Sequence, residues 1–118
     1  MTPGDRRATP AFAAVVVLSL VVLFAPHAPS EHAIPHLDKV VHATLFLLLA
    51  GTTHWRFGDR LPLLATVVAY GALSEVIQGV ALPSRDGDVK DALADAVGAL
   101  LGWVAARWLE RRAVSRAR

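Results

Sequence analysis

The sequence contains no cysteine among its 118 residues. This absence excludes disulfides, thiolate metal sites and cysteine nucleophiles. Two further catalytic patterns are missing, namely Gly-x-Ser-x-Gly, which presents a serine nucleophile, and Gly-x-x-x-x-Gly-Lys, which cradles phosphate groups. The chain therefore lacks the sequence signatures of cysteine chemistry, of serine hydrolysis and of nucleotide binding by a phosphate loop.

Charged residues are also scarce. They make up 19% of the chain, against 54% hydrophobic residues, whereas a soluble domain carries about 25% charged residues. The charges are unevenly placed, because long apolar runs have none and the two ends of the chain hold many. This distribution is typical of a small, single-domain membrane protein with several spans, and a soluble helical bundle is the alternative.

Four apolar segments separated by polar turns predict an all-α fold, a four-transmembrane-helix bundle. The predicted spans are residues 11–27, 38–55, 61–81 and 89–109, each close to the roughly 20 residues that cross a bilayer. A disordered cytoplasmic lead is predicted at 1–10 and a basic cytoplasmic tail at 110–118. A cleaved signal peptide is the alternative for the first segment, because that segment follows basic residues and ends near small ones.

The basic residues predict the orientation of these spans. Lys and Arg gather near the two termini and in the turn at Arg56 and Arg60, while loops 26–38 and 82–88 are mostly acidic. Because cytoplasmic segments are enriched in Lys and Arg, both termini and the middle turn should face the cytoplasm. The net charge is +2, but no aromatic residue lies between the final arginines to stack on bases. We therefore expect no nucleic-acid partner.

Carboxylates interrupt the last two apolar runs at helical spacing. Glu75 and Gln78 share one helix face, and Asp91 and Asp95 share another. A charge near the centre of a span costs on the order of 3 kcal/mol on insertion scales. Such side chains must therefore pair with another group or line a wet cavity.

These polar residues are predicted to meet at one depth below the outer surface. Glu75 and Asp95 lie six or seven residues inside their spans, about 9 Å by helix rise, and His42 lies closer to the surface. The predicted outward-facing site has nine ligand-binding residues: Asp38, Lys39, His42, Glu75, Gln78, Arg85, Asp88, Asp91 and Asp95. Within this set, the candidate catalytic residues are Glu75, His42 and Asp91.

Structural roles explain several of these residues as well. Asp38 and Asp88 suit helix caps, and Asp91 suits the favourable end of a helix dipole. Gln78 suits a polar contact between helices, and His42 a hydrogen-bonded core position. Lys39 and Arg85 suit interfacial anchors with apolar stems. Because helix capping also accounts for the carboxylates, neither a metal nor a cofactor is predicted.

Gly98 and Gly102 form a Gly-x-x-x-Gly pair in the fourth predicted span. Small residues at this spacing let the backbones of two membrane helices approach closely. The pair therefore predicts a close contact with a neighbouring helix, although loose packing against leucine-rich neighbours is the alternative.

Three motifs together carry a family resemblance. They are Asp38-Lys39-x-x-His42 followed by Phe46, then Glu75-x-x-Gln78, then Pro83-x-Arg85-x-x-Asp88-x-x-Asp91 with Gly98. In order and spacing, residues 38–102 resemble the VanZ-like family of small bacterial integral membrane proteins. The resemblance implies a four-helix domain in the bacterial inner membrane and a link to the cell envelope, because the founding member is associated with teicoplanin resistance. It implies no reaction, and Asp95 departs from the family pattern, which often has asparagine there.

Three functions follow as hypotheses. The first is a non-enzymatic protein that binds an envelope lipid, a glycan precursor or a glycopeptide, with Lys39 and Arg85 on anionic groups. The second is a membrane-embedded enzyme in which Glu75 or Asp91 acts as general base and His42 as acid or orienting group. The third is a small proton- or ion-coupled transporter with Glu75 and Asp95 as a relay, which would need a homo-oligomer.

Overall fold

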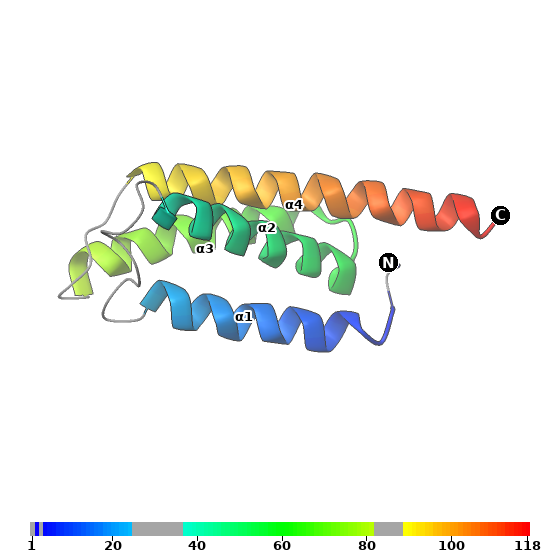
Figure 1. The fold of residues 1–118 in the computed structure, drawn as a ribbon, viewed down its shortest axis with the longest axis horizontal. Coiled ribbons are helices and arrows are strands. Elements are labelled where there is room, and N and C mark those ends of the chain that lie inside the picture. The colour runs from blue at the N-terminus through cyan, green and yellow to red at the C-terminus, as the bar shows by residue number, and fades with distance from the viewer. Residues whose placement is uncertain (1, 3, 25–36, 82–88) are drawn as a thin grey trace.

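The computed structural model describes residues 2, 4–24, 37–81 and 89–118, and within these ranges it contains helices and turns but no strand (Figure 1). The helices are α1 (Ala8–Phe24), α2 (Leu37–Phe57), α3 (Leu61–Ala81) and α4 (Val89–Arg116). Consecutive helices run in opposite directions, so both termini lie at one end of the bundle (Figure 1). The predicted all-α fold with four helices is confirmed.

The helix bounds differ from the predicted spans mainly at the ends of the chain. α3 has the predicted bounds, and α2 extends by one residue at its start and two at its end. α1 begins at Ala8, three residues before its predicted span, and α4 continues from the predicted end at 109 to Arg116. Much of the predicted basic tail is therefore helical, because its arginines and alanines favour helix as well.

The membrane prediction is supported in part. Leu61–Ala81 and Val89–Ala117 are long and apolar enough to cross a membrane. α1 is apolar but has only 17 residues. α2 has the length of a span but carries Asp38 and Lys39 in its first turn and Arg56 in its last. The described chain is thus a four-helix bundle with two helices of spanning length and composition.

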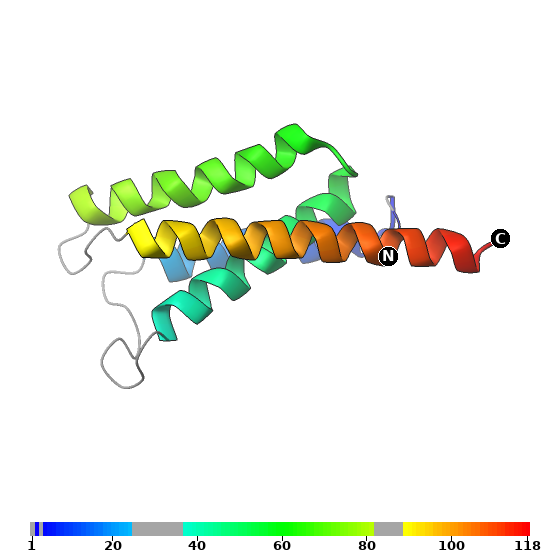
Figure 2. The ribbon, with the colours of Figure 1, turned by 90° about the horizontal axis from the view of Figure 1, so that it is seen from above.

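The closest helix pair is α2 with α4 (Figure 2). A Cβ atom on Gly98 would overlap the carbonyl oxygen of Ala43, and one on Gly102 would overlap the carbonyl oxygen of Leu47. Only glycine at these two positions permits this backbone contact. The close approach predicted from the Gly-x-x-x-Gly spacing is confirmed, and its partner is α2.

The apolar core follows this contact. Its buried residues come from all four helices: Leu23, Leu45, Phe46, Leu49, Ala50, Val67, Ala99 and Trp103. Because α2 contributes four of these eight residues and contacts each of the other helices, it is the central helix. His42 and His54, which lie toward the two ends of α2, are consequently buried by the neighbouring helices.

The turn between α2 and α3 is built on Gly58. Gly58 has a φ of +89°, a left-handed conformation that residues with a Cβ rarely adopt. Its N–H donates to the carbonyl oxygen of His54 at 2.8 Å, which closes the last turn of α2. This ending places the next residue, Asp59, within reach of α4.

Candidate functional site

Three helices contribute one ionisable side chain each to a buried cluster. His42 Nδ1 of α2 lies 2.7 Å from Asp95 Oδ1 of α4 and 3.6 Å from Glu75 Oε1 of α3. The three side chains are 4%, 1% and 7% exposed, respectively. We call these residues, together with Asp38, Lys39 and Asp91 at their edge, the polar site.

Small residues make this convergence possible. Asp95 lies almost one turn before Gly98, so the close contact of α2 with α4 brings its short side chain to His42. On the opposite side, a Cβ on Gly71 of α3 would lie 3.0 Å from Asp95 Cβ and 3.1 Å from Phe46 Cε1. The missing side chain at Gly71 therefore leaves the space that Asp95 occupies.

Lys39 links the edge of the polar site. Its Nζ donates to Asp38 Oδ2 at 3.1 Å and to Asp91 Oδ1 at 3.2 Å. The second bond joins the beginning of α2 to the beginning of α4. Asp38, predicted as a helix cap, lies inside the first turn of α2, and Asp91 lies in the first turn of α4 as expected.

The remaining predicted residues have different outcomes. Gln78 is 1% exposed, and its Nε2 makes no hydrogen bond with any residue that the structure describes. Asp95 Oδ2 is likewise buried, and in the described ranges it has no hydrogen-bond partner. Such orphaned polar atoms are costly in a protein interior, so they are expected where a ligand or water binds. Arg85 and Asp88 lie outside the described residues.

The polar site is acidic. Within the described part of the chain, four carboxylates gather around the single ammonium group of Lys39 and one imidazole. Groups of this kind accept hydrogen bonds from hydroxyls and bind amines. They also suit a divalent cation, since His42, Glu75 and Asp95 offer ligand atoms that all lie within 4.8 Å of one another.

A second polar cluster, which the sequence did not predict, joins the Gly58 turn to α4. Asp59 accepts hydrogen bonds from Trp103 Nε1 at 3.1 Å and from Arg107 Nε at 2.7 Å. The ring of His54 packs edge-on against Trp103 with centroids 4.9 Å apart, and its Nε2 lies 3.5 Å from Glu110 Oε2. We call these five residues the turn cluster.

The charge of Asp59 is stabilised by its partners on α4. Burial disfavours the ionised carboxylate, but the hydrogen bonds from Arg107 and Trp103 and the charge of Arg107 outweigh burial and lower the pKa of Asp59. Two features of the sequence could have pointed to this cluster. Asp59 lies in a tight turn, and Trp103 and Arg107 share one face of α4. Nothing local connects the two segments, so the pairing could not be predicted.

No family model, curated protein or solved structure matches this chain. The resemblance to the VanZ-like family accordingly rests on the motif residues alone. Of those residues, five belong to the polar site, namely Asp38, Lys39, His42, Glu75 and Asp91.

Proposed function

We propose that this chain is a multi-pass protein of the bacterial inner membrane, of VanZ-like type, that binds the head group of an envelope lipid or lipid-linked glycan in the polar site. The observation that carries the proposal is the convergence of His42, Glu75 and Asp95 from three helices in one buried cluster. Buried ionisable groups in membrane helices are costly and mark functional sites by default.

The distribution of charge supports the proposed orientation. The N-terminus, the turn between α2 and α3 and the C-terminus lie at one end of the bundle (Figure 1), and the sequence places most of the arginines in these three segments. The polar site lies near the other end, where α2 and α4 begin. With the arginines on the cytoplasmic side, the polar site faces outward, and all four helices span the membrane.

The chemistry of the polar site narrows the class of ligand. Lys39 is engaged by two carboxylates and is a poor partner for an incoming anion. The surplus of carboxylates favours head groups that donate hydrogen bonds or carry positive charge. Sugar hydroxyls and amino groups have this property, whereas a simple phosphate does not.

Lipid binding by the full chain in nanodiscs of phosphatidylcholine tests this proposal. A glucosyl lipid and a lysyl-phosphatidylglycerol should bind saturably, and phosphatidic acid, whose head group is a phosphate alone, should not. Asp95→Asn keeps the size of the side chain but removes its charge, and should weaken binding at least about tenfold through the loss of a charge-assisted hydrogen bond. The matched control is Asp59→Asn in the turn cluster, which should leave binding unchanged. Preferential binding of phosphatidic acid, or an equal loss of binding in both variants, would refute the proposal.

One observation favours an enzyme as the second candidate. Asp95 holds His42 through Nδ1 at 2.7 Å, which orients the imidazole and leaves Nε2 to exchange a proton with a bound ligand. Glu75, 3.6 Å from the same nitrogen, would supply a second acid–base group. Mass spectrometry of the bound lipid distinguishes the candidates: an enzyme produces an altered lipid that Glu75→Gln abolishes, whereas a binding protein releases its ligand unchanged.

A further inference from the structure

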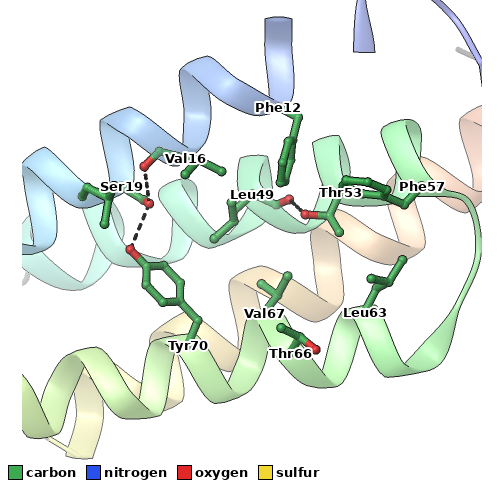
Figure 3. A pocket seen from close by; sticks show the side chains of 11 residues that line it. Phe12, Val16, Ser19, Leu49, Thr53, Phe57, Leu63, Thr66, Val67 and Tyr70 are labelled. Carbon is green, nitrogen blue, oxygen red and sulfur yellow. Dashed lines mark hydrogen bonds between the residues drawn. The ribbon is translucent and has the colours of Figure 1, made fainter. Parts of the chain in front are cut away.

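α1, α2 and α3 line a hollow of about 270 Å³ that is open on one side (Figure 3). At the end nearer the α2–α3 turn, Phe12 packs edge-on against Phe57 with ring centroids 5.2 Å apart. At the other end Ser19 Oγ and Tyr70 Oη are hydrogen bonded at 3.1 Å. The hollow thus runs along the bundle axis between the turn and the level of Tyr70.

The walls of the hollow offer no free hydrogen-bond donor to a ligand. Ser19, Thr53 and Thr66 each donate to a backbone carbonyl oxygen three or four residues earlier, at 2.7, 2.6 and 2.8 Å. Because the proton of Ser19 is used in this way, Tyr70 is the donor in the bond between them. The surface that the hollow exposes is entirely apolar, so it suits hydrocarbon and not a polar solute.

One aromatic layer separates the hollow from the polar site. The ring of Tyr70 lies 5.8 Å from the ring of Phe46, and Phe46 closely approaches the position of Gly71 beside Asp95. Along α3, Tyr70 precedes Glu75 by five residues, about 7.5 Å of helix rise. A molecule whose head lies at the polar site can therefore reach the hollow within a few methylene groups.

The hollow is large enough for a hydrocarbon chain but too small for an α-helix. An α-helix with its side chains is about 10–12 Å across, so a helix of another protein cannot enter a space of about 270 Å³. A single extended hydrocarbon chain has the required width and chemistry. We propose that the ligand of the polar site is an amphiphile whose hydrocarbon chain lies in the hollow between α1 and α3. This inference rests on the proposed function, which concerns the head group, and adds the binding site of the hydrocarbon chain.

Photo-crosslinking tests the position of the chain. The probe is a glucosyl lipid with a diazirine at the middle of its acyl chain, bound to the full protein in phosphatidylcholine nanodiscs. Adducts should concentrate on Val16, Thr66 and Val67, and Asp95→Asn should reduce them at least about tenfold, because the chain is held through its head group. Adducts on Leu73, which is 57% exposed on α3, should be unaffected.

The absence of cysteine allows a second test by reversible blocking. Thr66→Cys places a single thiol at the open side of the hollow, and Leu73→Cys places one on the same helix outside the hollow; both positions are exposed. Reaction with a benzyl methanethiosulfonate should weaken binding of the glucosyl lipid several-fold at Thr66→Cys alone, and dithiothreitol should restore it. This restoration excludes misfolding as the cause.

The outcomes separate the two proposals. If the glucosyl lipid binds and Asp95→Asn weakens it, but the adducts are spread evenly over the helices or blocking has no effect, the hollow is not the chain site and the proposed function stands. If the lipid does not bind saturably, the proposed function fails. In either case, adducts in the hollow that are equally abundant in Asp95→Asn come from bulk lipid, and the proposal that the hollow holds the ligand's hydrocarbon chain fails.

Discussion

The polar site and the turn cluster are built from similar residues but differ in how their charges are balanced. Each has a buried histidine of α2, His42 or His54, beside carboxylates from other segments. The two histidines are twelve residues apart, about 18 Å along the helix. The turn cluster has two carboxylates, Asp59 and Glu110, and the guanidinium of Arg107 binds the first, whereas the polar site has four described carboxylates for the one ammonium group of Lys39.

This difference separates a structural role from a binding role. A carboxylate that accepts hydrogen bonds from Trp103 and Arg107 and remains partly exposed joins a turn to a helix at little cost. A carboxylate buried as deeply as that of Asp95 is costly and contributes little to stability. Excess buried charge therefore indicates function better than the mere presence of a His–Asp pair.

The largest expected effect concerns the packing on which the polar site depends. In Gly98→Ala the new methyl group overlaps the backbone of Ala43, so α2 and α4 must separate next to His42. We expect a loss of roughly 3 kcal/mol in the free energy of unfolding, measured by circular dichroism during titration with sodium dodecyl sulfate.

Gly51→Ala is the matched control for that change. Its methyl group would lie 3.6 Å from the carbonyl oxygen of Gly102, an ordinary contact, and should alter stability by less than about 0.5 kcal/mol. Equal losses in the two variants would contradict the role given to the contact of Gly98 with Ala43.

An intermediate loss in the free energy of unfolding is expected for Asp59→Asn, and this loss should depend on pH. Because the pKa of Asp59 is lower in the folded protein than in the unfolded chain, its stabilisation is present above the unfolded pKa of about 4 and is lost as pH falls through the folded value. Asp59→Asn should therefore cost about 1 kcal/mol at pH 7. The difference in unfolding free energy between wild type and variant should shrink below about pH 4. A difference that persists at about pH 2 would show that the charge is not its source.

The smallest expected effect concerns one hydrogen bond of the same cluster. Trp103→Phe removes the N–H donor to Asp59 but keeps an aromatic ring against His54. Because Arg107 still binds Asp59, the lost hydrogen bond itself should account for only about 0.5 kcal/mol, and binding of the glucosyl lipid should be unchanged. A loss of lipid binding would show that the two clusters are coupled and that the structural role of the turn cluster is incomplete.

Much of the helical framework and part of the polar site could be predicted from the sequence. The bounds of α3 were correct because Pro62 marks its beginning and the apolar run has the length of a span. The proximity of Glu75 to His42 was anticipated because both lie near the predicted outer ends of their helices. The predicted end of α4, at residue 109, was too early. The arginines that were assigned to a basic tail continue the helix to Arg116, because arginine favours helix.

Local properties, namely apolar length, helical spacing and the position of basic residues, were determined by the sequence itself, because each acts over a few neighbouring residues. The tertiary structure alone decided that His42 pairs with Asp95, that Asp59 binds α4 and that α1 and α3 leave an apolar hollow. These features depend on how closely the helices pack, and two glycines of α4 set the distance of that helix from α2. The contacts that result join residues about 50 positions apart, a separation over which no local pattern in the sequence specifies a distance.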